Sequence, residues 1–169
     1  MNTNRITGLA LITPVIAIAV WFVIGFAMLG GVGPDDPQKY IAEMGANSTA
    51  ITYLIPLVTL LFLIGVAGIG YIKKTMEGGP GSYIAGFAWF LIILGSAGQL
   101  GEVAASLALA EAAAGANLAV ASSMYAIGQA IGAVTTAFSM LGFALIGVAI
   151  LQAKNFSPII AGLMVVTGI

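Results

Sequence analysis

The sequence contains no cysteine and no histidine among its 169 residues. These absences exclude disulfide bonds, thiol nucleophiles, Ser-His-Asp catalysis, zinc sites, iron–sulfur clusters and the usual axial ligands of haem. Charge is also scarce, because five basic and six acidic residues make up only 7 % of the chain. Soluble domains carry about 25 % charged residues, since their surface faces water. With 60 % hydrophobic residues, this chain is expected to face lipid instead.

The remaining charge also limits the possible partners. A formal net charge of −1 leaves no basic surface for nucleic acid. The acidic residues form no pattern typical of a metal site, so we expect neither a metal nor a cofactor. Membrane lipid is the partner that the composition predicts.

Long apolar runs predict membrane-spanning helices. A helix needs about 20 apolar residues to cross a hydrocarbon layer of about 30 Å. The runs that meet this length are residues 6–30, 51–72, 82–113 and 118–152. A fifth run, 158–169, is too short to cross, and we interpret it as a truncated span in preference to a re-entrant segment. The prediction is a single all-α integral membrane helical bundle over residues 1–169, with four full spans and a partial fifth helix.

The basic residues predict the orientation of these spans. Cytoplasmic loops of membrane proteins carry an excess of Lys and Arg. If the spans alternate in direction, one side holds four basic residues, which are Arg5, Lys73, Lys74 and Lys154. The other side holds only Lys39. We therefore expect a multi-pass plasma-membrane protein whose N-terminus is cytoplasmic.

The first outer loop, residues 31–49, contains the pattern of a short interfacial helix. Asp36 is suited to be its N-cap and Pro37 its first residue, and Gly45 is a candidate terminator. The helix is expected to lie on the membrane surface, with an apolar side formed by Tyr40, Ile41 and Met44. Asp35 and Asp36 could instead bind a cation, but Ca²⁺ needs six to eight oxygen ligands. Capping is the better interpretation.

The third span carries a polar stripe. Gln99, Glu102 and Ser106 are three and four residues apart, so they share one helical face. Counting along the fourth span places Gln129 and Thr135, or Thr136, at a similar depth. The candidate polar cluster therefore comprises Gln99, Glu102, Ser106, Gln129 and Thr135. Glu102 could hold helices together by hydrogen bonds, reach the outer water layer, or line a cavity that binds a ligand or passes protons.

Small residues predict close packing within the hairpin formed by 82–113 and 118–152. Alanine recurs every fourth residue at Ala104, Ala108 and Ala112, and the other arm has Gly128 and Gly132. Such spacing lets helix backbones approach closely. Both arms are longer than a bilayer crossing needs, so either both helices tilt strongly or the end of the hairpin projects beyond the membrane. An apolar projection must then pack on itself or against a partner subunit.

Several short motifs together resemble a known family of membrane proteins. These are Arg5 with Gly8, the loop Pro34-Asp35-Asp36-Pro37 followed by Tyr40, the pair Ala46–Asn47, Tyr71 with Lys73 and Lys74, Glu102, and Ser157-Pro158. This pattern resembles the domain-of-unknown-function 4386 family of bacteria and archaea. Two features depart from it: Ile72 replaces the usual Pro after the Tyr, and the third span lacks a charged start. The resemblance implies a six-helix bundle in a bacterial or archaeal membrane and implies no activity.

Two functions are compatible with these patterns. The first is a structural or accessory subunit of a membrane assembly, or a self-associating bundle, without catalytic machinery. The second is a carrier or receptor for a small apolar or weakly polar molecule, with Glu102 and Gln99 as its polar contacts. An enzyme is not expected, because a lone carboxylate has no nucleophile, metal or second acid to work with.

Overall fold

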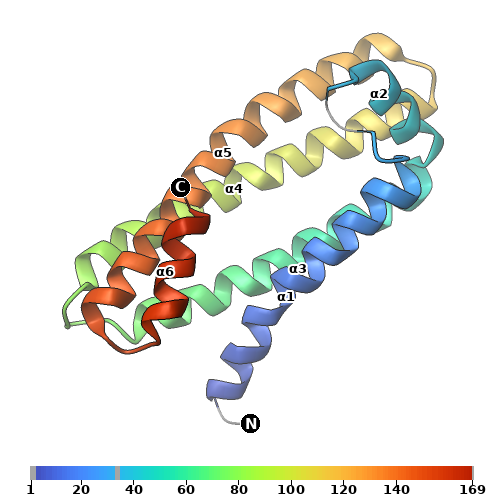
Figure 1. The fold of residues 1–169 in the computed structure, drawn as a ribbon. Helices are drawn as coiled ribbons and strands as arrows, with labels where there is room; N and C mark the ends of the chain where they lie inside the picture. The colour runs from blue at the N-terminus through green and yellow to red at the C-terminus, as the bar shows by residue number, and fades with distance from the viewer. Residues whose placement is uncertain (1–2, 33–34, 169) are drawn as a thin grey trace.

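The computed structural model describes residues 3–32 and 35–168, which are helical apart from their turns (Figure 1). The elements are α1 (Thr3–Val23), the π-helical turn η1 (Ile24–Met28), α2 (Pro37–Ala46), α3 (Ser48–Lys74), α4 (Ser82–Ala114), α5 (Leu118–Ala153) and α6 (Pro158–Thr167). Four helical segments are long and apolar enough to cross a membrane: Gly8–Met28, Ser48–Lys74, Ser82–Ala114 and Leu118–Ala153. The predicted all-α fold is confirmed, and these bounds lie within a few residues of the predicted spans.

The long helices form two antiparallel pairs, α1 with α3 and α4 with α5, that lie side by side (Figure 1). α4 and α5 pack together along most of their length, and α1 packs along α3. α1 has almost no contact with α4 or α5. The pairs are joined at both ends instead, by α3 packing on α4 and by α2 packing on α4 and α5.

One junction lies at the lysine end of the bundle, which we define by Lys73, Lys74 and Lys154. Its hydrophobic core comprises Val66, Ile69, Ile72, Met76, Ala85, Ala88, Ile92, Ile146, Ala149, Ile150 and Ala161. The two turns at this end are tied together, because Asn155 Nδ2 donates a hydrogen bond of 2.9 Å to Thr75 Oγ1. Gly81 has φ +86°, and a Cβ there would lie 2.6 Å from the carbonyl oxygen of Ala149. The lysine end is therefore closely packed.

The other junction is the α2 end. Its core comprises Ile24, Leu29, Ile41, Met44, Ile51, Ile55, Leu109, Ala110 and Ala121. The Asp36 cap is confirmed, since its Oδ1 accepts a 3.2 Å hydrogen bond from the amide of Lys39. Ile41 and Met44 are only 6 % and 1 % exposed, so the apolar side of α2 faces protein rather than lipid. α2 thus covers the end of the α4–α5 hairpin.

The sequence predicted that Gly45 would end α2, but the helix continues to Ala46. Instead, Gly45 lets α2 approach α4: a Cβ on Gly45 would lie only 2.8 Å from the Cβ of Ala113. Asn47 follows at the junction between α2 and α3. Its Nδ2 donates hydrogen bonds of 2.7 Å to the carbonyl oxygen of Met28 and 3.0 Å to that of Glu43. Asn47 therefore fixes the end of η1 against the start of α3.

A proline lies within α1 where it packs on α3. Pro14 has no N–H to donate to the carbonyl of Ala10, and Thr13 Oγ1 donates a hydrogen bond of 2.7 Å to that oxygen instead. The ring of Pro14 lies directly against Gly65. The missing helical hydrogen bond is thus replaced locally, and the helices stay close.

α6 begins with Ser157 as its N-cap and Pro158 as its first residue. The Ser157 hydroxyl accepts a hydrogen bond of 3.3 Å from the amide of Ile159. The helix packs back on α5, where a Cβ on Gly147 would lie 2.6 Å from the carbonyl oxygen of Ala161.

Candidate functional site: a groove around Glu102

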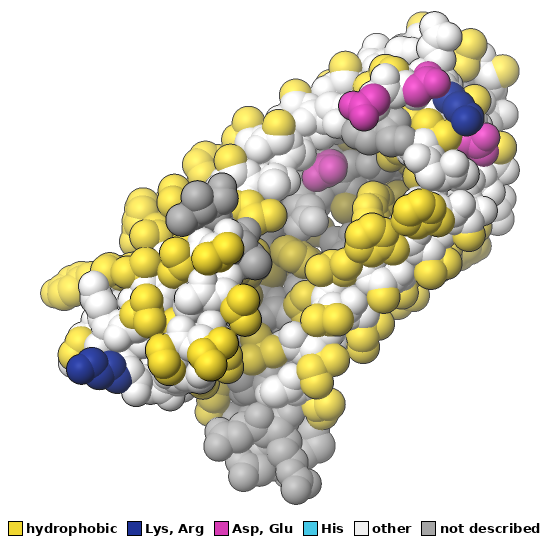
Figure 2. Space-filling model, in the orientation of Figure 1, with side chains coloured by type: hydrophobic (Ala, Val, Ile, Leu, Met, Phe, Trp, Pro, Cys, Tyr) yellow, Lys and Arg dark blue, Asp and Glu magenta, His cyan; other side chains and the backbone are white. Residues whose placement is uncertain are grey.

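Between its two closed ends, the molecule contains a groove that separates the α1–α3 pair from the α4–α5 pair. Figure 2 shows this hollow on the face of the molecule, bordered by hydrophobic side chains. The groove has two main compartments of about 430 Å³ and 480 Å³. Glu102 lines both of them, together with Trp21 and Ser106. The compartments therefore meet at the carboxylate.

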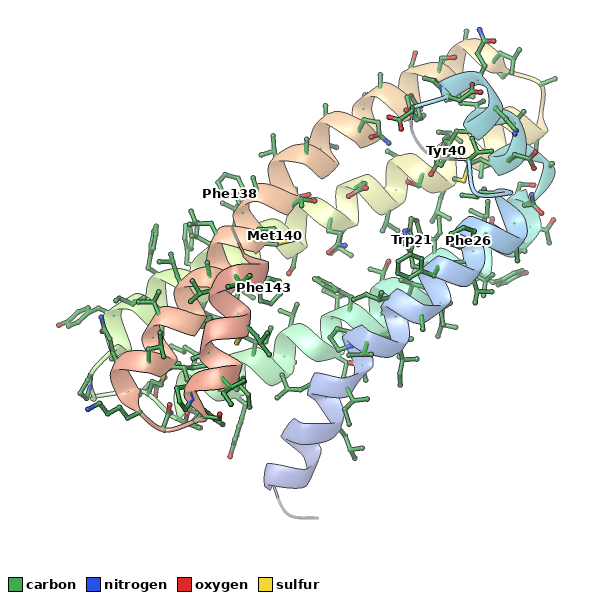
Figure 3. The ribbon with its side chains drawn as sticks, in the orientation of Figure 1. Trp21, Phe26, Tyr40, Phe138, Met140 and Phe143 are labelled. Carbon is green, nitrogen blue, oxygen red and sulfur yellow. The ribbon has the colours of Figure 1, made fainter. Side chains whose placement is uncertain are left out.

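The compartment nearer α2, which we call the aromatic pocket, is rich in rings. Its aromatic residues are Trp21, Phe22, Phe26, Tyr40 and Tyr125. Phe22 and Phe26 stack with their ring centroids 6.3 Å apart, and Tyr40 and Tyr125 lie tilted at 5.7 Å. Trp21 and Phe26 project from the α1 side of the groove (Figure 3). The wide turn η1 carries Phe26, as π-helical turns often do at functional sites.

The second compartment, which we call the central pocket, is mainly aliphatic. Its apolar residues are Pro14, Ala17, Ile18, Ile55, Val58, Phe62, Val103, Met140 and Phe143. Its polar residues are Gln99, Glu102, Ser106, Thr59 and Thr136. Met140 and Phe143 face the groove from α5, opposite α1 and α3 (Figure 3). A smaller cavity of about 140 Å³ adjoins this pocket and also contacts Gln99 and Glu102.

The carboxylate of Glu102 is partly buried and has no hydrogen bond or ion pair with the part of the chain that the structure describes. The Glu102 carboxylate faces Gly132 on α5. A Cβ on Gly132 would be 2.9 Å from Glu102 Oε1 and 3.0 Å from Glu102 Oε2. The salt bridge found among the described residues, between Lys73 and Glu77 at 2.7 Å, lies at the lysine end. Among the described residues that line the groove, none carries a positive charge that would compensate the negative charge of Glu102.

Burial and the charge of Glu102 both affect the pKa of Tyr40 on α2. Burial raises the pKa of the Tyr40 hydroxyl above its ordinary value, and the negative charge of Glu102 and the neighbouring Tyr125 raise it further. All three causes disfavour the ionised phenolate. The carboxylate on α4 and the ring of Tyr40 line the same aromatic pocket, so the charge of Glu102 acts on the Tyr40 hydroxyl.

The other members of the predicted polar cluster divide between the pockets. Gln99 and Ser106 share the central pocket with Glu102, while Gln129 lines the aromatic pocket. Thr135 borders the small cavity, but its hydroxyl donates a 3.2 Å hydrogen bond to the carbonyl oxygen of Gly132. Its neighbour Thr136 reaches the central pocket instead.

The predicted packing residues are placed differently from one another. Ala104 is exposed, Ala108 and Ala112 are partly buried, and the buried Ala105 is the residue that faces Gly128. Gly132 makes room for Glu102 rather than for an alanine. The closest approaches of α4 and α5 occur elsewhere: a Cβ on Gly95 would lie 2.9 Å from the carbonyl oxygen of Thr135, and one on Gly142 would lie 2.6 Å from Ile92 Cγ1.

Sequence reasoning missed the aromatic residues of the groove. The apolar run 6–30 indicates no role for Trp21 and Phe22 beyond that of a membrane span, and Tyr40 is expected only on the apolar side of the short helix. Because α1 is apolar on every side, no periodicity distinguishes its groove face from its lipid face. The available signal was the aromatic content of residues 21–26, which lie at the same end of the bundle as α2.

Comparisons with protein-family models, with curated proteins and with solved structures found no match. The resemblance to the domain-of-unknown-function 4386 family therefore stays a prediction. Function has to be inferred from the groove itself.

The chemistry available in the groove is that of binding. Across residues 3–32 and 35–168, no three acidic side chains lie close enough together to hold a metal ion. Glu102 offers a charged acceptor, Gln99 and Gln129 offer amides, and Ser106 offers a hydroxyl. The rings and aliphatic side chains supply most of the contact surface. Such a site can orient a largely apolar molecule by a small number of polar contacts.

Proposed function

We propose that this protein is a membrane receptor or carrier for a small, largely apolar molecule that binds in the groove. The observation that carries the proposal is the cavity around Glu102, with compartments of about 430 Å³ and 480 Å³. Small-molecule sites are mainly apolar concavities of roughly 300–1,000 Å³ with a small number of convergent polar groups. Glu102 and Gln99 are the polar contacts that we assign to the ligand.

The energetics of Glu102 support this proposal over a role in helix packing. A carboxylate that held helices together would accept hydrogen bonds from a neighbouring helix. Among the described residues the nearby hydroxyls of Ser96 and Thr135 donate to the carbonyl oxygens of Ile92 and Gly132 instead. An unpartnered charge in an apolar setting is costly, so such residues usually serve substrates or ions. A ligand with a donor group would offset this cost.

The two tryptophans of the chain allow a direct test. Trp21 lines both pockets, whereas Trp89 lies near the lysine end, where a Cβ on Gly70 would be 2.7 Å from its Cη2. Purified Trp89→Phe retains only the groove tryptophan, and Trp21→Phe retains only the other. Titration with bromonaphthalene, a neutral heavy-atom contact quencher, should quench Trp89→Phe fluorescence with a saturable curve.

Trp21→Phe is the matched control, and its fluorescence should fall only in proportion to the quencher that dissolves in the micelle. Non-saturable quenching of the same slope in both variants would show that the groove does not bind a small apolar molecule, and the proposal would be abandoned.

A structural or accessory subunit is the second candidate. It is favoured by α1, which packs on α3 and leaves large apolar side chains outside the groove exposed, such as Ile16 and Val23. A transmembrane helix of another chain could cover this side. Native mass spectrometry from mild detergent should then show a homo-oligomer or a stable companion, and a strictly monomeric species would remove this candidate.

We also propose that the protein lies in the plasma membrane of a bacterium or archaeon with its N-terminus in the cytoplasm. Support comes from the lysine end, which gathers Lys73, Lys74 and Lys154, while Lys39 lies on α2 at the other end. A membrane-impermeant amine reagent applied to intact cells should label Lys39. Labelling of Lys73 from outside would reverse the orientation.

A further inference from the structure

We propose that the ligand of the groove is a hydrophobic organic cation, whose charged group lies in the aromatic pocket between the Glu102 carboxylate and the rings of Trp21 and Tyr40. This inference rests on the proposed function, because it names the chemical class of the molecule that the groove binds. The apolar part of the same molecule occupies the central pocket.

The distribution of charge favours a cation. Glu102 lines both pockets, and no Lys or Arg side chain is among the described residues that line them. The nearer end of the molecule is also mainly acidic, with Asp35, Asp36 and Glu43 on or beside α2 (Figure 2). An anion would meet uncompensated negative charge, whereas a cation would neutralise it.

The rings provide the second, independent argument. Aromatic faces are electron-rich and attract cations, most strongly at Trp, and desolvation strengthens the attraction. The aromatic pocket contains Trp21, the stacked pair Phe22–Phe26 and the tilted pair Tyr40–Tyr125. Rings around a single carboxylate are suited to an alkylammonium or phosphonium group, which has a diffuse charge and an apolar surface.

The shape of the groove indicates that the rest of the ligand is an extended apolar part. Trp21, Glu102 and Ser106 line both compartments, so a molecule bound beside the carboxylate can extend from one into the other. The central pocket then surrounds its apolar part with side chains such as Val58 and Phe62. A small metal cation would leave this pocket empty, and among the described residues no group of three His, Cys, Asp or Glu side chains is placed to hold one.

The test compares two ions of the same shape and opposite charge, tetraphenylphosphonium and tetraphenylborate. Each is titrated against the Trp89→Phe protein in nonionic detergent, with bromonaphthalene quenching of Trp21 as the competition readout. Tetraphenylphosphonium should displace the quencher at a concentration about tenfold or more below that of tetraphenylborate, as expected for a charge-assisted contact. Glu102→Gln should reduce the affinity for the phosphonium by about tenfold and should affect bromonaphthalene much less.

The Gly132→Ala variant keeps the negative charge of Glu102 but displaces its carboxylate. The new Cβ would lie 2.9 Å from Glu102 Oε1, so the flexible side chain must shift and the phosphonium affinity should fall. Gly101→Ala is the matched control, because its Cβ would meet Ile131 Cδ1 at an ordinary 3.6 Å. Helical circular dichroism establishes that both variants are folded.

The outcomes separate the two proposals. Equal affinity for the two ions, or a phosphonium affinity that Glu102→Gln leaves unchanged, would overturn the cation proposal. Saturable quenching by bromonaphthalene in that same experiment would leave the proposed function standing. Loss of saturable quenching by every probe would remove both.

Discussion

The α4–α5 interface is closed along most of its length, whereas the boundary between the two helix pairs is open in its middle. Glycines explain why the α4–α5 interface is closed. A Cβ on Gly95 of α4 would meet the backbone of α5, and a Cβ on Gly142 of α5 would meet the backbone of α4. At the open boundary the facing residues are large, such as Trp21, Phe62 and Phe143. Gly25, which lines the groove, has no atom within 4 Å of the position of a Cβ. In lipid, helices close where small residues let backbones meet, because no hydrophobic effect drives them together.

The largest expected effect comes from filling the closed interface. In Gly95→Ala the new Cβ would lie 2.9 Å from the carbonyl oxygen of Thr135 and 3.0 Å from the amide nitrogen of Ser139, so the helices must separate. The free energy of unfolding should fall by about 1–3 kcal/mol, as for overpacked cores. Denaturation by sodium dodecyl sulfate, followed by circular dichroism, measures it.

Gly25→Ala is the counterpart on the open boundary, and its stability should match that of the unsubstituted protein or exceed it slightly. A large loss of stability in this variant would show that the two helix pairs are packed closely in the membrane, and the comparison would fail.

A smaller effect is expected at the α2 end, which holds the pairs together. Asn47→Ala removes the 2.7 Å hydrogen bond to the carbonyl oxygen of Met28 and should lower the free energy of unfolding by about 1 kcal/mol. Asn155→Ala removes an exposed bond to Thr75 at the lysine end and should cost less. Thermal unfolding in detergent compares the two, and a larger loss for Asn155→Ala would reverse the expected order.

The smallest expected effect is on the pKa of Tyr40, which lies on α2 and lines the aromatic pocket. The raised pKa of Tyr40 means that the hydroxyl stays protonated above the ordinary tyrosine pKa of about 10. Its contribution to stability is complete below that pH and is lost as the pH rises through the folded-state pKa. Glu102→Gln should lower the pKa of Tyr40 only in part, because burial is the larger cause.

Absorbance at 295 nm measures this titration, and the Tyr40→Phe protein, subtracted from the parent, isolates the signal of Tyr40. An identical curve in the Glu102→Gln protein would separate the carboxylate from the aromatic pocket and would contradict the geometry of the groove.

Elements with a strong local signal could be predicted from the sequence. Apolar length located the spans, and the Asp36-Pro37 pair located the start of α2, because capping depends on adjacent residues. The spacing of Gln99, Glu102 and Ser106 placed three polar side chains on one face of α4. The structure shows the same residues together in the central pocket.

The relative placement of the helices could not be predicted in this way. Gly45 looked like a helix terminator, and only the position of Ala113 on α4 shows that it is a contact residue. Trp21 lies on a helix that is apolar all round, so neither period nor composition reveals which side faces α5. These features depend on which helices meet in three dimensions, and short-range patterns carry no information about that.

The two cores that close the ends of the bundle also determine how the groove can be reached. With the ends packed, its open side is the long flank between α1 and α5 (Figure 2), which in a bilayer is bathed by acyl chains. A molecule that enters there must first dissolve in the membrane, so the bilayer acts as its reservoir. Two compounds with identical contacts inside the groove would then differ in apparent aqueous affinity by the ratio of their lipid–water partition coefficients.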